Sequence, residues 1–83
     1  MVLLINILHD MISDGRLGRV VASKIGKRYS TMMRELNPYD PSAKCSAQTM
    51  LDIMEVTGDV RPLEFMAKKL GYHIVKEKEN GRH

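Results

Sequence analysis

The sequence predicts an all-α domain, a compact bundle of about five helices. Three observations favour this fold class: the chain has 83 residues, apolar residues recur at three- and four-residue spacing, and methionine is abundant (seven) while aromatic residues are scarce. Aliphatic and thioether side chains suit a core between packed helices. We expect the folded domain to cover residues 1–72, followed by a short flexible or oligomerising tail over residues 73–83.

The N-terminal apolar run predicts a helix over residues 2–13, because its apolar residues form one wide face. Asp14 and Gly15 are expected to end this helix, since glycine readily adopts the positive φ found past a helix C-terminus. The run lacks the basic segment and cleavage site of a signal peptide. It is also shorter than the roughly 20 residues that span a bilayer, so we expect no membrane segment.

Two helices are expected next, the first over residues 17–25 and the second from residue 28 or 29 to residue 36. Gly26 separates them, and Asn37 ends the second because the residue before a proline disfavours the α region. The apolar residues of the first of these helices are expected to face inward: Leu17, Val20, Val21 and Ile25.

The C-terminal half predicts two more helices after a proline-containing loop over residues 37–42. Ser46 is expected to cap a helix over residues 47–56, and Asp59 a helix that ends at Gly71. The positions expected to face inward on these two helices are Met50, Leu51, Ile53, Met54, Leu63, Met66, Ala67 and Leu70. The final eight residues are polar and charged, and we expect them to be disordered.

Positive charge is concentrated in one short segment. Six basic residues and no acidic one lie between positions 16 and 34, namely Arg16, Arg19, Lys24, Lys27, Arg28 and Arg34. The chain has 13 basic and 10 acidic residues, so its net charge of +3 is +6 in this segment and −3 elsewhere. Such a field is typical of a protein that binds the phosphate backbone of nucleic acid. An ordinary solvated face is the alternative.

The same segment has the spacing of a helix-turn-helix. The motif needs a small residue where two helices cross, a glycine at the turn, and apolar residues that hold both helices to the core. In that order these residues are Ala22, Gly26, and the four anchors Val21, Ile25, Met32 and Leu36. The offsets recur in lambda-type Cro and repressor proteins. The second helix would then enter the major groove of double-stranded DNA.

This geometry assigns roles to individual residues. The candidates for base contact are Arg28, Tyr29, Ser30, Thr31, Met33 and Arg34, and the candidates for phosphate contact are Arg16, Arg19, Lys24, Lys27 and Lys44. An arginine such as Arg34 can form a bidentate pair with guanine. Tyr29 is as well suited to the core as to a contact. The loop that holds Tyr39 is either a plain connector or a stiff wing beside the recognition helix.

The chain resembles the phage regulatory protein CII family of temperate phages and prophages. The resemblance covers roughly residues 3–75 and is carried by IGKRYSTMMRELNPYDPSAK (25–44), QTMLDIMEVTGD (48–59), RPLEFMA (61–67) and LGY (70–72). It implies a lambda-repressor-like DNA-binding domain that regulates transcription in the lysis–lysogeny decision. It also places residues 29–31, 33 and 34 on the recognition helix. Cys45 departs from the pattern, in which a leucine is expected.

Partners follow from this interpretation. We expect a homodimer or higher homo-oligomer in the cytoplasm of a bacterial host, held by the last helix and residues 72–75, with two recognition helices about one DNA turn apart. An activator would also contact RNA polymerase, and the acidic side chains available for that are Asp52, Glu55, Asp59 and Glu64, with a plain solvated surface the favoured alternative. The rival function is a helical protein-interaction adaptor that has lost DNA binding.

Other classes of function lack the residues they need. Cys45 is the single cysteine, and His9, His73 and His83 are far apart, so neither a disulfide nor a metal site is expected. No catalytic set or glycine-rich phosphate loop is present, and we therefore expect no enzyme and no cofactor. Four aromatic residues, Tyr29, Tyr39, Phe65 and Tyr72, are too few for the base stacking typical of single-strand binders.

Overall fold

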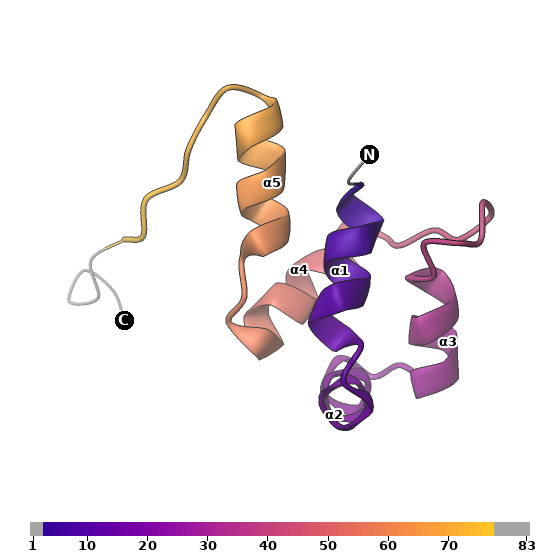
Figure 1. Ribbon diagram of the computed structural model, residues 1–83. Coiled ribbons are helices and arrows are strands. Elements are labelled where there is room, and N and C mark those ends of the chain that lie inside the picture. Colours follow the sequence, from indigo (N-terminus) through magenta and orange to yellow (C-terminus); the bar gives the residue numbers. More distant parts are fainter. Residues whose placement is uncertain (1–2, 78–83) are drawn as a thin grey trace.

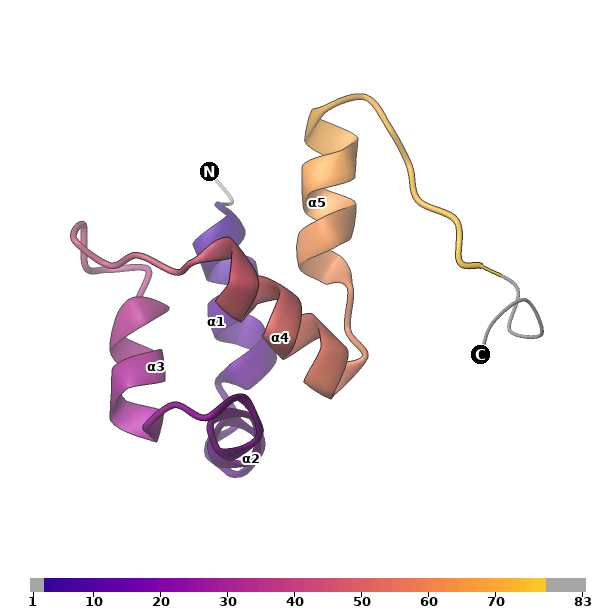
Figure 2. The same ribbon diagram turned by 180° about the vertical axis from the view of Figure 1, so that it is seen from behind.

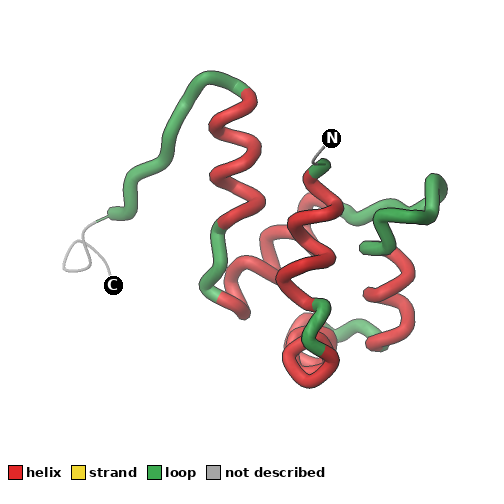
Figure 3. Tube along the Cα trace, in the orientation of Figure 1, coloured by secondary structure: helices red, strands yellow, loops and turns green. Residues whose placement is uncertain are grey.

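The computed structural model describes residues 3–77, which form five helices and no strand (Figures 1 and 3). The helices are α1 (Leu4–Ile12), α2 (Gly15–Ile25), α3 (Tyr29–Glu35), α4 (Ala47–Thr57) and α5 (Arg61–Lys69). The predicted all-α fold is thus confirmed. The expected helical position of Val2 and the last part of the expected tail, residues 78–83, lie outside the described residues.

The core lies where α1, α2, α3 and α4 meet. Its buried apolar side chains are Leu8, Met11, Ile12, Val21, Ala22, Met32, Leu36 and Ile53. All of them are aliphatic or thioether side chains, as the composition predicted. Figure 2, seen from behind, shows α4 passing across α1, with α3 on one side of the molecule and α5 on the other.

The start of α2 corrects one expectation. Gly15 is the first residue of α2 and has no positive φ, whereas Asp14 is the N-cap. The Asp14 carboxylate accepts hydrogen bonds from the backbone amides of Arg16 at 2.9 Å and Leu17 at 3.4 Å. The turn residues therefore begin the second helix instead of closing the first, and α2 starts two residues earlier than its apolar pattern indicated.

Two other helix ends agree with the sequence. Gly26 adopts a φ of 77° and ends α2. At the start of α4, the Ser46 hydroxyl accepts a hydrogen bond from the Thr49 amide at 3.1 Å, which satisfies one of the free amides of the first turn.

Several apolar side chains that were expected to face inward are exposed. They are Leu17, Val20, Leu51, Leu63 and Leu70. The reason is how these short helices pack: α2 packs mainly against α3 and α4, and α5 mainly against α1. Each helix uses one face for these contacts. An apolar side chain next to that face, but not on it, remains exposed to solvent.

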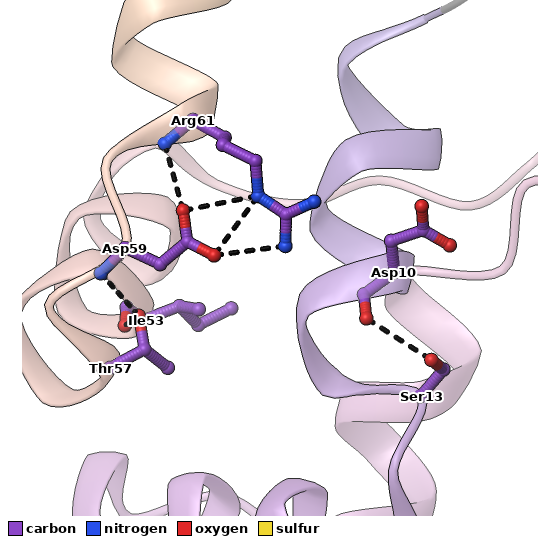
Figure 4. Close-up of polar contacts among 6 residues, drawn as sticks. All are labelled: Asp10, Ser13, Ile53, Thr57, Asp59 and Arg61. Carbon is purple, nitrogen blue, oxygen red and sulfur yellow. Dashed lines mark hydrogen bonds and ion pairs between the residues drawn. The ribbon is translucent and has the colours of Figure 1, made fainter.

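A short polar network holds the beginning of α5 (Figure 4). Val60 is the N-cap by backbone geometry, and the Asp59 carboxylate, which was expected to cap, accepts a hydrogen bond from the Arg61 amide at 3.1 Å. The same carboxylate forms an ion pair with the Arg61 guanidinium at 2.9 Å, which lowers the pKa of Asp59. Figure 4 shows the guanidinium lying between Asp59 and the helix that carries Asp10. The Asp59 amide also donates to the Thr57 hydroxyl at 3.1 Å, so side-chain hydrogen bonds link the end of α4 to the start of α5.

Candidate nucleic-acid interface

The pair α2 and α3 is consistent with the predicted helix-turn-helix, with Val21 buried and Ile25 half-buried on α2. The Lys27 amide donates to the Ala22 carbonyl at 2.9 Å, so the chain turns sharply at Gly26 before α3 begins. Met32 and Leu36 are fully buried and hold α3 to the core. The opposite side of α3 faces away from α4 and α5 at the edge of the molecule (Figure 1).

Most of the predicted phosphate-contact residues are exposed. Arg16, Arg19 and Lys24 on α2 are exposed, as is Lys44 in the loop after α3. Lys27 differs, because it precedes α3 and its half-buried ammonium pairs at 3.1 Å with the carboxylate of Glu35, the last residue of that helix. Part of its charge is thus neutralised within the protein.

The six predicted base-contact residues divide into two groups. Arg28, Ser30 and Arg34 are exposed, whereas Tyr29, Thr31 and Met33 are half-buried. Tyr29 and Met33 pack against the core cluster. The solvent-facing surface of α3 is consequently polar and basic.

Tyr29 also organises the crossing of α2 and α3. The Arg19 guanidinium lies over the Tyr29 ring, 4.3 Å from its centroid. Beneath the ring is Gly18, where an added Cβ would lie 2.9 Å from the Tyr29 Cε1 atom. The ring therefore fills the space between the helices and supports a cation at their surface. Periodicity could not reveal this contact, because it joins residues of different helices.

The loop after α3 is shaped by its own side chains. The Asn37 side-chain oxygen accepts a hydrogen bond from the Tyr39 amide at 2.9 Å, and the Asp40 carboxylate accepts from the Ser42 amide at 2.9 Å and hydroxyl at 2.7 Å. The bonds from Ser42 lower the pKa of Asp40. Tyr39 is 88% exposed. A hollow of about 180 Å³ between α3 and the loop is lined by two cations, Arg34 and Lys44, and by two carboxylates, Glu35 and Asp40.

Cys45 follows this loop and is half-buried. Desolvation, followed by the nearby Glu35 carboxylate, raises the pKa of its thiol. Its side chain packs against the edge of the core cluster. Over residues 3–77 the structure contains no group of three His, Cys, Asp or Glu side chains able to hold a metal ion.

None of the five described helices has the length and apolar character needed to cross a membrane.

The comparison with protein families matches the chain over residues 6–83 to the model of phage regulatory protein CII (CP76). The chain belongs to this family. The resemblance seen in the sequence is therefore confirmed, and the membership supports a role as a phage regulatory protein, a kind of function distinct from catalysis. No curated protein and no solved structure matches the chain.

Proposed function

We propose that this regulator binds double-stranded DNA in a sequence-specific manner and controls transcription in the lysis–lysogeny decision of a phage or prophage. The observation that carries the proposal is the α2–α3 surface. Its inner side is fixed by buried anchors, and its outer side presents exposed basic side chains with no acidic residue between positions 16 and 34. A positive surface around an exposed helix suits entry into a major groove.

The exposed residues of α3 are best placed to contact bases. Arg34 has two parallel donors that fit the O6 and N7 acceptors of guanine, and Ser30 can donate to or accept from either base type. Arg28 precedes the first turn of the helix, at the end that contacts base edges in this class of motif. Thr31 and Met33 are less accessible, so their contacts would be limited to the edges of α3.

Contacts to phosphates would come from the exposed cations of α2 and the loop. Arg16, Arg19 and Lys24 lie on the helix that would cross the DNA backbone, and Lys44 lies beside the other end of α3. In this proposal Tyr29 acts mainly through Arg19, which it supports from below. Lys27 contributes less, because Glu35 neutralises part of its charge.

A transcriptional activator would also contact the RNA polymerase of a bacterial host, in the cytoplasm. Of the four acidic residues suggested for this contact, Asp59 is paired with Arg61, and Asp52 accepts a hydrogen bond from Gln48 at 2.8 Å. Glu55 and Glu64 are exposed. We therefore assign any polymerase contact to these two.

Gel-shift binding to duplex fragments from the neighbouring genome, at several salt concentrations, tests the proposal. We expect one fragment to be selected. If four cations per protomer each neutralise one phosphate, affinity should fall about 10²-fold per protomer between 50 and 200 mM salt. Equal binding to every fragment would mean that the protein coats DNA without sequence specificity. The absence of binding at low salt would favour the adaptor function, and so would weak binding that salt does not change.

A further inference from the structure

The loop between α3 and α4 projects from the molecule next to α3. In both views of the ribbon it extends beyond α3, on the side away from α5 (Figures 1 and 2). Tyr39 lies in this loop and is 88% exposed, more than any other large apolar side chain of residues 3–77. Packing within the domain therefore does not explain a tyrosine at this position.

The loop holds Tyr39 in a defined position. The residues on either side of the Tyr39–Asp40 pair are Pro38 and Pro41, and the ring of each proline fixes its φ. The Asn37 side-chain oxygen accepts a hydrogen bond from the Tyr39 amide at 2.9 Å, and the Asn37 carbonyl accepts one from the Asp40 amide at 3.2 Å. A side chain carried by such a stiff loop loses little conformational freedom on binding, so its contact adds more to affinity.

The charges beside the loop favour an anionic partner. Arg34 and Lys44 are exposed, line the hollow between α3 and the loop, and take part in neither of the two ion pairs of residues 3–77. The carboxylates that line the same hollow are bonded within the protein. That of Glu35 forms an ion pair, and that of Asp40 accepts two hydrogen bonds. A phosphate would therefore be attracted to this side of the loop.

The length of α3 brings the loop to the edge of a major groove. The helix has seven residues and is therefore about 10 Å long, whereas the groove is about 12 Å wide. If the first turn of α3 contacts base edges, the loop after its last turn is within reach of the phosphate strand that borders the groove. Tyrosine hydroxyls are among the side-chain groups that bind DNA phosphates.

We propose that the Tyr39 hydroxyl donates a hydrogen bond to a DNA phosphate beside the groove that α3 enters. The inference rests on the proposed DNA binding and adds an uncharged contact to those of the cations. Because a neutral donor neutralises no phosphate, it releases no counterion. The contact should therefore raise the affinity for every sequence and leave the salt dependence unchanged.

Fluorescence anisotropy of the full chain tests this contact. The probes are two duplexes, a fragment of the neighbouring genome and a scrambled version of it, each at several salt concentrations. We expect Tyr39→Phe to weaken binding to both about 3- to 10-fold, because one hydrogen bond is lost, with the same slope of log affinity against log salt. Lys44→Ala should also weaken both, but it should reduce that slope by about one.

Tyr72→Phe is the matched control. Tyr72 is 74% exposed but follows α5, so this variant should bind both duplexes like the wild type. Because Tyr39 is so exposed, Tyr39→Phe should keep the circular dichroism and the urea unfolding transition of the wild type.

A double-mutant cycle tests whether the loop positions Tyr39. Asn37→Ala removes the hydrogen bond to the Tyr39 amide, so it should weaken DNA binding in the wild-type background and have no further effect in Tyr39→Phe. A loss of the same size in both backgrounds would overturn the positioning by Asn37.

The possible outcomes separate this contact from DNA binding itself. A wild type that binds neither duplex at low salt would overturn the proposed function and the Tyr39 contact with it. A wild type that binds both duplexes no better than Tyr39→Phe does would leave DNA binding in place and overturn only the phosphate contact. A loss confined to the genomic fragment would also overturn it, since Tyr39 would then contact a base.

Discussion

Gly18 occupies a position in α2 that has no room for a side chain. A Cβ atom at this position would lie 2.8 Å from the Ile12 carbonyl oxygen and 2.9 Å from the Tyr29 ring. Both are closer than van der Waals contact allows, and the carbonyl belongs to the backbone. Because α2 approaches its neighbours here, only glycine fits without a shift of the chain.

We therefore expect Gly18→Ala to lower the free energy of unfolding by about 1–3 kcal/mol, the usual cost of overpacking. Gly15→Ala is its control. A Cβ at Gly15 would lie 3.8 Å from the Tyr29 hydroxyl, an ordinary contact, and alanine favours a helix over glycine. Urea unfolding of both variants should show a loss for the first and none for the second. Equal stability of the two would mean that α2 can move away from Tyr29.

The sequence could not predict this role of Gly18. Ala22 was expected as the small residue at the crossing, and it is buried as expected. Gly18 lies one turn earlier. Glycine is required there because Ile12 and Tyr29 lie close to it, and local sequence patterns do not show that these residues meet. The Lys27–Glu35 ion pair was also missed, since Lys27 precedes α3 and Glu35 ends it, eight positions along the chain.

Among the elements, α2 depends most clearly on a single cap. The Asp14 carboxylate accepts two amide hydrogen bonds of its first turn. Asp14→Ala should therefore lower the free energy of unfolding by about 1 kcal/mol, whereas Asp14→Asn should have little effect because asparagine keeps an acceptor oxygen. Thermal unfolding followed by circular dichroism measures both. Similar losses for the two variants would indicate that charge, not the hydrogen bonds, stabilises α2.

The start of α5 should contribute a pH-dependent stability. Arg61 lowers the pKa of Asp59 in the folded state, so folding favours the ionised carboxylate. Its contribution is complete above the unfolded pKa, near 3.9, and is lost as the pH falls through the lower folded value. Asp59→Asn should reduce the urea midpoint slightly at pH 7 and match the wild type at the acid end.

Glu55→Gln is the control for this pH effect, because Glu55 lies outside the two ion pairs of the described residues. Its midpoint should follow the wild type throughout the titration. A difference between Asp59→Asn and wild type that persists in acid would show that the Asp59 hydrogen bonds, and not its charge, hold α5.

The sequence predicted the helical segments more accurately than it predicted which faces of those helices are buried. The glycine at Gly26 and the cap at Ser46 are local signals, and both were placed correctly. Leu63 and Leu70 were expected inward because they share a face with the required period, yet they are exposed. A period identifies the residues that share a face, but the neighbour that covers that face is decided by tertiary packing.

At the scale of the whole molecule, α3 and α5 lie on opposite sides of the bundle (Figure 1). The exposed basic side chains of α2 and α3 are therefore on the other side of the molecule from the exposed Leu63 and Leu70. The basic side was predictable, because charge segregation is visible in the sequence. The expected contact of the last helix and tail with a second copy stays a prediction; the exposure of Leu63 and Leu70 leaves these two side chains free for it.

The most direct test of DNA recognition by α3 is the affinity of Arg34→Ala for two duplexes, the fragment selected by the wild type and a scrambled version of it. Fluorescence anisotropy would follow both, with Lys76→Ala as a control that removes an equal charge from the tail. Loss of a bidentate base contact should weaken binding to the selected fragment about 10- to 100-fold and to the scrambled one much less. An equal loss on both duplexes would contradict base reading by Arg34 and leave α3 with phosphate contacts alone.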